Sequence, residues 1–375
     1  MKKYLPVLIS LLFFTELSSA QFALYKGDAS LEFSGGAATF LNKRFYQAGD
    51  DVHDKDRIGI DYAFLEMKMR KGRNWRAVLK TEFIDANAGI TFDQNLMLKK
   101  AFLQYETAHT GTFVKLGYDK IPYSKLGEES GFKSPFQNRS EVTNGNSFAL
   151  RDAGIVLGQE CWRQRVQIYL GAFTGLGENS LIGDNDASGN FEYTGRIQFA
   201  FPSNPDQDQI DFHSTPLPTI QLGLNALYAN KVTDDGGDFS YTVFNGTKQA
   251  AGVDASIYFE GLCVVVESHL FQFTPNDTLR LMHYITDHFN AGGVTAQATY
   301  FSKKFHSLIG VRYDDYNPND LIMNDNRRTV SPVFNFFFPN SGAFVKLQYS
   351  YRLSVIEGGS PWKDHDLRVA FNYSF

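Results

Sequence analysis

Apolar and polar side chains alternate every second residue along most of this chain. Near the C-terminus, Val369, Phe371, Tyr373 and Phe375 are separated by polar or small residues, and residues 220–228 repeat the pattern. A β-strand points successive side chains to opposite faces, whereas a helix would need apolar residues three and four positions apart. The alternation therefore predicts strands that have one apolar face and one polar face.

About sixteen segments show this alternation, and each is close to the ~9–11 residues that a tilted strand needs to cross a bilayer. The predicted strands are residues 29–37, 58–70, 74–85, 96–107, 112–120, 151–160, 163–172, 191–200, 219–229, 248–259, 262–272, 292–301, 305–313, 329–338, 343–352 and 366–375. A series of strands of this length is typical of a transmembrane β-barrel.

The predicted connections are short at one end of the strands and long at the other. Residues 71–73 and 260–261 are tight joints, whereas the alternate connections 38–57, 121–150 and 314–328 are long. Outer-membrane barrels have this layout, with short periplasmic turns and long extracellular loops. A secreted β-sandwich also alternates along its strands, but it has no reason to sort its loops by length. The sequence thus predicts an all-β fold, a transmembrane antiparallel β-barrel of about 16 strands.

One connection does not follow this rule. Residues 202–219 stand where a short turn is expected, yet the segment is long and rich in proline. Two interpretations stay open, namely an overlooked pair of strands or an excursion of the chain into the periplasm.

The first twenty residues have the three parts of a secretory signal peptide. A basic start precedes a mostly apolar stretch over residues 4–14, and residues 18–20 are the small residues that a signal peptidase reads. We therefore expect residues 1–20 to be cleaved and residues 21–375 to form a single outer-membrane barrel domain.

The average composition combines the apolar and the polar faces of the predicted strands. Of 375 residues, 43% are hydrophobic and 15% aromatic, and 36 basic residues against 41 acidic ones give a net charge of −5. This near balance argues against a nucleic-acid partner, which usually requires a basic excess. No uncharged apolar run of 18 residues follows the N-terminal segment, so a helical membrane protein is excluded. The two cysteines, Cys161 and Cys263, are expected to be free thiols, because secreted proteins that rely on disulfides carry more.

Charged residues inside the predicted strands are assigned to the lumen, because a lipid-facing Lys or Arg at mid-depth costs about 2–4 kcal/mol. The basic members of this inward set are Lys68, Arg70, Arg76, Lys80, Lys115, Arg165, Arg196, Arg312, Lys346, Arg352 and Arg368. The acidic members are Glu32, Glu66, Glu82, Glu106, Glu192, Asp254 and Glu267. So many charges require water, and a sixteen-stranded barrel is wide enough for an aqueous channel. Eleven basic residues against seven acidic ones give a mild lean towards anions.

The longest predicted connection and its flanking strands carry a motif. Residues 117–158 read GYDKIPYSKLGEESGFKSPFQNRSEVTNGNSFALRDAGIVLG. This segment resembles the corresponding region of the phosphate-selective porin O and P family of outer-membrane proteins. The matching residues are Gly117, Lys120, Ile121, Pro122, Tyr123, Arg139, Ser140, Arg151, Asp152 and Gly154, and the terminal Phe375 fits as well.

The resemblance implies a trimeric sixteen-stranded porin whose third loop folds into the lumen as a constriction. It also implies that the barrel-assembly machinery reads the terminal aromatic residue, Phe375. Phosphate-specific members of the family use a dense array of Arg and Lys, whereas acidic residues are interleaved in this loop.

The residues of the loop by themselves agree with a folded constriction. A connection of about thirty residues is usually functional or disordered, and Pro122, Pro135 and several aromatic residues favour a folded loop. An inward fold would bring its charges to the narrowest point of the channel. Alternatively, Arg139, Arg151 and Asp152 pair with the barrel wall and only pin the loop.

The sequence therefore predicts a porin in the bacterial outer membrane, a water-filled channel for passive diffusion of small hydrophilic solutes with a mild preference for anions, phosphate among the candidates. The candidate pore-lining and constriction residues are Lys120, Lys125, Lys133, Arg139, Arg151, Asp152, Lys68, Arg70, Lys80, Lys115, Arg196, Arg312 and Lys346. No catalytic residue, cofactor or metal is expected, since no hydrolase elbow, Walker or zinc motif occurs.

Expected partners are small solutes or anions, and the lipid and lipopolysaccharide of the outer membrane. The resemblance adds the barrel-assembly machinery and a homotrimer. The alternative is a loop-closed barrel that acts as a surface adhesin or receptor, because long loops suit that function equally well.

Overall fold

The computed structural model describes residues 22–48, 51–83, 97–107, 110–143, 147–177, 189–202, 209–232, 244–276, 279–281, 284–322, 326–354 and 362–375. The predicted signal peptide, residues 1–20, lies outside the described residues. Within these ranges, no helix is long and apolar enough to cross a membrane.

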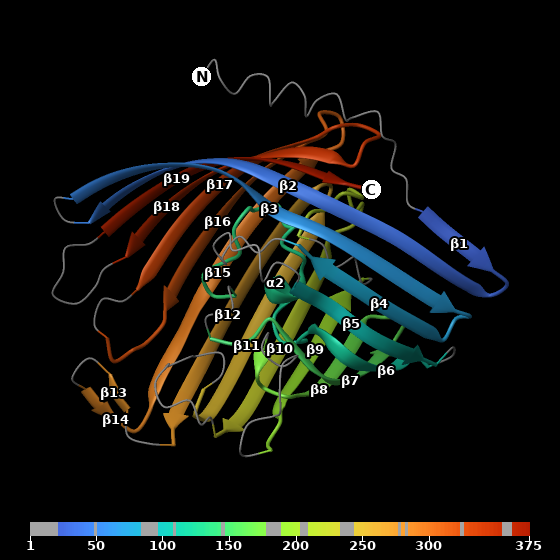
Figure 1. Cartoon of the computed structure of the whole chain (residues 1–375), viewed down its shortest axis with the longest axis horizontal. Coiled ribbons are helices and arrows are strands. Elements are labelled where there is room, and N and C mark those ends of the chain that lie inside the picture. The colour runs from blue at the N-terminus through green and yellow to red at the C-terminus, as the bar shows by residue number, and fades with distance from the viewer. Residues whose placement is uncertain are drawn as a thin grey trace.

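The described chain forms a closed antiparallel β-barrel (Figure 1). Its main sheet has 17 strands, of which all but β1 (Phe22–Lys26) form a ring that follows chain order and closes where β19 pairs with β2. The ring consists of β2 (Ala29–Ala48), β3 (Asp51–Lys71), β4 (Trp75–Glu82), β5 (Met97–Glu106), β6 (Thr112–Lys120), β7 (Arg151–Cys161), β8 (Val166–Phe173), β9 (Glu192–Phe201), β10 (Thr219–Lys231), β11 (Gly246–Phe259), β12 (Leu262–Pro275), β15 (Phe289–Ser302), β16 (Ser307–Asn317), β17 (Arg327–Phe337), β18 (Ala343–Ser354) and β19 (Trp362–Ser374). Two further strands, β13 (Leu279–Leu281) and β14 (Tyr284–Thr286), pair as a small hairpin. The predicted all-β barrel of about 16 strands is confirmed.

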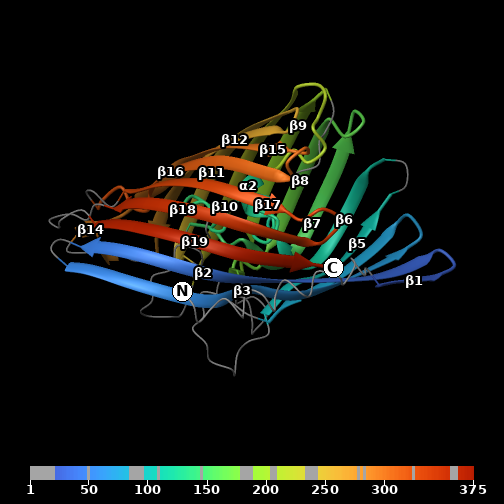
Figure 2. The ribbon, with the colours of Figure 1, turned by 90° about the horizontal axis from the view of Figure 1, so that it is seen from above.

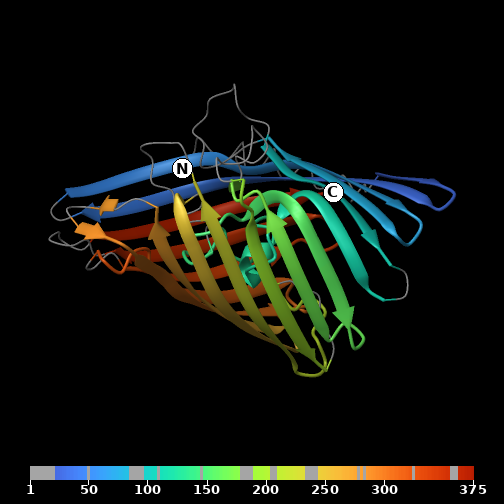
Figure 3. The ribbon, with the colours of Figure 1, turned by 90° about the horizontal axis from the view of Figure 1, so that it is seen from below.

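The strands wrap at a steep tilt around a segment that lies inside the ring (Figures 2 and 3). This segment carries the short helix α2 (Lys125–Glu128). Most predicted strand bounds agree with the structure within a few residues, and β6 was predicted at its observed bounds.

The predicted long connection over residues 38–57 is wrong. β2 runs to Ala48 and β3 begins at Asp51, and the two strands stay in register along this whole stretch apart from one irregularity at Ala38/Thr39. The polar residues here had indicated a loop, but they sit on a paired hairpin. Lys43 and Asp56, for example, face each other across it as an exposed ion pair at 3.7 Å.

The exterior of the barrel is apolar, as a lipid-facing surface requires. Large apolar side chains on alternate strand positions are exposed, among them Ile58, Leu116, Leu270 and Ile309. Exposed aromatic residues gather near the short turns, where porin-like barrels carry an aromatic girdle at the membrane interface. These residues are Trp75, Tyr105, Trp162, Phe201 and Phe305.

The C-terminal residue closes the ring against β2. The backbone N–H of Phe375 donates to the carbonyl of Gly35 at 3.0 Å, and the N–H of Gly35 donates back at 3.1 Å. β1 continues along the same edge of β2, pairing with residues 29–33 where β19 has ended. At the short-turn end of the barrel, β2 and β3 thus extend further than β19.

The proline-rich β9–β10 connection turns into the barrel. Its described part, residues 209–218, contains no strand, so an overlooked strand pair is wrong for this part of the segment. Gln209, Ile210 and Asp211 are buried among lumen side chains. The predicted excursion into the periplasm is therefore wrong for these residues, because the chain enters the lumen here.

Candidate functional site: the lumen and its inner loop

The connection between β6 and β7, called loop 3 here (residues 121–150, described for 121–143 and 147–150), lies inside the barrel. Tyr123, Phe136 and Phe148 are almost completely buried. Its helix α2 begins at an N-cap, Ser124, whose hydroxyl accepts a hydrogen bond from the N–H of Gly127 at 2.9 Å. Such a cap satisfies one of the free N–H groups at a helix start.

The start of loop 3 is bound to β12. The carboxylate of Glu267 accepts the hydroxyl of Ser124 and, at 2.9 Å, the backbone N–H of Leu126. His269 contacts the same carboxylate, and the ring of Tyr123 packs against His269 with centroids 5.0 Å apart. Because a buried carboxylate needs partners of this kind, the contact fixes the loop against the wall.

The middle of loop 3 is bound to β16 and β18. Arg312 donates to the carbonyls of Asn138 at 2.8 Å and Arg139 at 3.1 Å. Lys346 donates to the carbonyls of Ser134 at 2.6 Å and Phe132 at 3.2 Å. These two cations were predicted to line the channel, but both donate hydrogen bonds to backbone carbonyls of loop 3.

Three more of the predicted residues hold loop 3 or the wall beneath it. Lys120 donates to the carbonyls of Gly127, at 2.9 Å, and Glu129. Lys125 is buried and donates to the amide oxygen of Gln221; burial lowers the pKa of Lys125, and Arg196 adds to this effect. Arg196 is held by the carboxylate of Asp254 at 2.6 Å.

The wall beneath loop 3 carries balanced, buried ion pairs. Its pairs are Arg196–Asp254 at 2.6 Å, Lys248–Glu192 at 2.9 Å and Arg312–Asp314 at 2.9 Å. All six side chains are nearly inaccessible. This side of the lumen, from β9 to β16, therefore presents little net charge to a passing solute.

The opposite side, from β3 to β7, carries a surplus of cations, which we call the basic wall. It consists of Lys68, Lys80, Lys99, Lys100, Lys115 and Arg151, with the carboxylates of Glu66, Glu82 and Asp119 among them. Glu66 pairs with Lys68 at 2.8 Å, and Asp119 pairs with Lys115 at 2.7 Å. Arg151 is an electrostatic neighbour of Lys80 and of Lys100. Among the described residues named here, six cations meet three carboxylates, while Asp61, also in β3, pairs with Arg368 of β19.

Lys99 and Lys100 are adjacent in sequence, and both side chains lie on the lumen side of β5. The register of β4 and β5 shifts between Lys80 and Thr81, so that Lys80 faces Lys100 while Thr81 faces Leu98. A β-bulge of this kind lets consecutive side chains share a face. Lys99 reaches Glu82 at 3.3 Å and Lys100 reaches Asp119 at 4.0 Å. Strand parity does not predict both lysines on one face, because consecutive residues share a face only at an irregularity such as this bulge.

The remaining predicted residues lie in different surroundings. Lys133 is exposed on loop 3, and Arg70 is exposed opposite Arg76 near a short turn. Arg139 donates to the carbonyl of Glu129 at 3.0 Å, so it also stabilises loop 3. Asp152 is buried and caps the β8–β9 loop, accepting the hydroxyl of Thr174 and the N–H of Gly175; in the part of the chain described, Asp152 does not line the lumen water.

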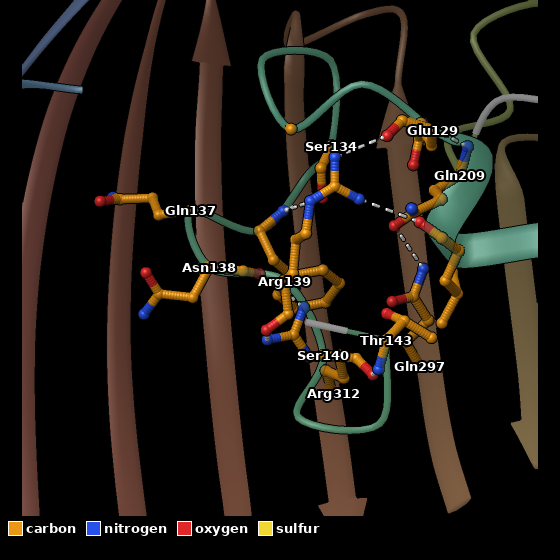
Figure 4. Close-up of a pocket in the computed structure, with 13 residues that line it drawn as sticks. Glu129, Ser134, Gln137, Asn138, Arg139, Ser140, Thr143, Gln209, Gln297 and Arg312 are labelled. Carbon is orange, nitrogen blue, oxygen red and sulfur yellow. Dashed lines mark hydrogen bonds between the residues drawn. The ribbon is translucent and has the colours of Figure 1, made fainter. Parts of the chain in front are cut away.

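A small pocket lies between loop 3 and the wall (Figure 4). Arg139, Gln209, Gln297 and Arg312 are among its lining residues. Its volume of about 10 Å³ leaves room for about one water molecule, so it is too small to pass a hydrated solute. Loop 3 therefore packs closely against this part of the wall, whereas the side chains of Lys68 and Lys100 on the basic wall stay partly accessible.

No protein-family model and no curated protein matches this chain. Among solved structures, the outer-membrane channel DcaP of Acinetobacter baumannii matches with a TM-score of 0.63 and 14% identity, over 94% of this chain and 100% of that chain. The chain has a porin fold. The anion-selective porin from Comamonas acidovorans matches with a TM-score of 0.56 and 11% identity, over 92% and 100% of the two chains. Salmonella typhi OmpF, in a complex with daunomycin, matches with a TM-score of 0.55 and 12% identity, over 94% and 100%.

The porin fold and the apolar exterior agree with the predicted location in the bacterial outer membrane. The similar structures are described as channels and porins, and the alternative of a loop-closed adhesin gains no support from them. Membership of the phosphate-selective porin O and P family stays a prediction from the loop 3 motif.

Proposed function

We propose that this protein is an outer-membrane porin, a water-filled channel for passive diffusion of small hydrophilic solutes that prefers anions. The observation that carries the proposal is the difference between the two sides of the lumen. The pairs beneath loop 3 are balanced and buried, whereas the named residues of the basic wall, counted among the described residues, are six cations and three carboxylates. A mobile anion meets the unbalanced side because loop 3 covers the other.

The partial exposure of the basic wall supports this account. The side chains of Lys68 and Lys100 are 33% and 29% accessible, whereas those of Arg196 and Lys248 are each 2% accessible. Cations that face water raise the local concentration of anions through their potential, whereas neutralised and covered cations do not. Rings or rows of Lys and Arg are the usual basis of anion selectivity in pores.

We infer that residues 1–20 are a cleaved signal peptide, that Phe375 is read by the barrel-assembly machinery, that lipid and lipopolysaccharide surround the exterior, and that three copies assemble. One similar structure, OmpT of Vibrio cholerae, is described in a trimer form. Phosphate is one anion that the channel would admit, and the loop 3 motif is what favours it.

The decisive experiment is conductance of the full-length protein in planar bilayers. Reversal potentials in a KCl gradient should show anion preference, and Lys80→Gln together with Lys100→Gln should lower the anion-to-cation permeability ratio by about two- to tenfold. Lys304→Gln is the matched control, because Lys304 is exposed in the β15–β16 turn outside the lumen. Silent membranes would refute the channel, and a cation preference in the wild type would refute the selectivity.

Phosphate needs a separate measurement. Replacing chloride by phosphate on one side gives the relative permeability of the two anions, and block of chloride current by millimolar phosphate reports binding. Equal behaviour of phosphate and other anions of similar size would leave an anion-preferring porin without phosphate specificity.

A further inference from the structure

The β9–β10 connection enters the lumen from the mouth opposite to loop 3. We call its described residues 209–218 the insert. The carbonyl of Gln209 accepts the hydroxyl of Thr299 at 3.0 Å, and its side-chain oxygen accepts the amide of Gln297 at 2.8 Å. Gln297 lies five residues inside the end of β15 at Ser302. At about 3.3 Å per residue, the insert therefore reaches roughly 16 Å along the wall.

The base of the insert is tied to the neighbouring turns. The carboxylate of Asp211 accepts the N–H of Thr215 at 2.8 Å and the N–H of Gly261 in the β11–β12 turn at 2.9 Å. Lys303, in the β15–β16 turn, donates to the carbonyl of His213 at 2.7 Å. These bonds cross between three separate connections, so the insert is held in one position.

The insert rests on an apolar part of the lumen wall. Ile210 packs with the inward-facing side chains of Phe301, Leu308 and Val333. The ring of Phe212 contacts that of Phe301, with centroids 5.0 Å apart in an edge arrangement. Burying an aliphatic or aromatic side chain contributes about 1.5–3 kcal/mol, so these contacts hold the insert strongly against the lumen wall. Inward apolar residues would otherwise be out of place in a water-filled lumen.

The tip of the insert meets loop 3. The backbone N–H of Gln209 donates to Oε1 of Glu129 at 3.1 Å. Phe136 of loop 3 joins the same apolar cluster as Ile210. A segment from the short-turn mouth and a loop from the long-loop mouth are thus joined by one hydrogen bond and one apolar contact inside the barrel.

We propose that the insert is a second channel-narrowing element, which fills the β15–β17 side below loop 3 and supports that loop from beneath. The inference rests on the proposed porin function, because narrowing has meaning only for an open channel. Solutes then pass beside the basic wall, and the size limit of the channel is set from both mouths. Loop 3 alone would leave the apolar seat of Phe301, Leu308 and Val333 open to water.

Undocking the insert tests the proposal in the full-length protein. Ile210→Asp places a charge in the apolar seat and should release the insert. We expect single-channel conductance to rise by about twofold or more, because conductance follows the open cross-section of a pore. In a liposome-swelling assay with sugars of increasing size, the variant should admit larger sugars than the wild type.

The matched control lies in the same connection. Leu217→Asp introduces the same charge at a side chain that is 64% exposed, and it should leave conductance and the sugar limit unchanged. Heat-modifiable migration and the β-sheet circular dichroism signal establish that each variant is folded. If Ile210→Asp does not fold, Ile210→Ala and Phe212→Ala loosen the same contact with less disturbance.

The outcomes separate this inference from the porin proposal. A conducting wild type whose folded insert variants have the same conductance and sugar limit overturns the inference alone. A silent wild type refutes the channel whatever the insert variants do, and the inference is refuted with it.

Discussion

Oε2 of Glu267 accepts the backbone N–H of Leu126 at 2.9 Å, across 141 positions of sequence. The other oxygen of the same carboxylate accepts the hydroxyl of Ser124, so one side chain of β12 secures the start of loop 3. Loop 3 is therefore attached to the barrel by charged side chains that point inward, and these same charges are removed from the surface that a solute meets.

Glu267→Ala should loosen loop 3. Each hydrogen bond to a buried charged group contributes about 1.5–3 kcal/mol, so the free energy of unfolding in urea should fall by several kcal/mol. Open-channel current should become noisier because the loop start is no longer held. Glu260→Ala is the control, since Glu260 is exposed in the turn of the same hairpin and both observables should stay at wild-type values.

The buried pair of Arg196 and Asp254 gives a stability prediction. Removing one partner of a buried pair costs about 3–5 kcal/mol, because the other charge is left uncompensated. Asp254→Ala should fall near the lower end of this range, since Glu128 stays within 3.6 Å of Arg196. The double variant Arg196→Met with Asp254→Leu should recover most of the loss in urea unfolding. A double variant no more stable than Asp254→Ala would contradict the uncompensated-charge explanation.

Removing a carboxylate from the basic wall should strengthen anion preference. Glu66→Gln takes away the partner of Lys68 at 2.8 Å and of Lys80 at 3.9 Å, so both cations act more fully on a passing anion. The change in reversal potential should be large at 0.1 M salt and small at 1 M, because the Debye length falls from about 10 Å to about 3 Å. Asp56→Asn, on the exposed end of the β2–β3 hairpin, serves as control. An equal effect of Glu66→Gln at both salt concentrations would argue against an electrostatic cause.

Gly117, where β6 approaches loop 3, should not tolerate a side chain. A Cβ there would lie 2.2 Å from the carbonyl oxygen of Ala101, and its φ of +130° is one that other residues rarely adopt. Gly117→Ala should therefore destabilise the barrel by about 1–3 kcal/mol or more and lower the folded fraction seen by heat-modifiable migration. Gly195→Ala is a matched control in β9, because its nearest neighbouring atom is at 3.8 Å. Full folding of Gly117→Ala would contradict this steric argument.

The sequence predicted the fold closely because a membrane barrel is specified by local rules. Each strand must alternate between lipid and lumen, so the parity of Leu65, Glu66, Met67 and Lys68 could be assigned without knowing their neighbours. The β2–β3 hairpin was mistaken for a loop because it carries charges such as Lys43 and Asp56 on strand positions, where the parity rule of a lipid-facing strand does not apply.

The sequence by itself determined the face of most strand charges, with Lys99, Lys100 and the exposed turn residue Arg165 as exceptions, and the tertiary structure decided what those charges do. Parity placed Lys80, Arg312 and Lys346 on the same face, but it could not tell that Lys80 lies beside Glu66 on the basic wall while Arg312 and Lys346 bind loop carbonyls. The difference depends on which side of the barrel loop 3 and the insert occupy. Those positions come from contacts between residues far apart in sequence, such as Gln209 with Glu129, and no strand-by-strand pattern records them.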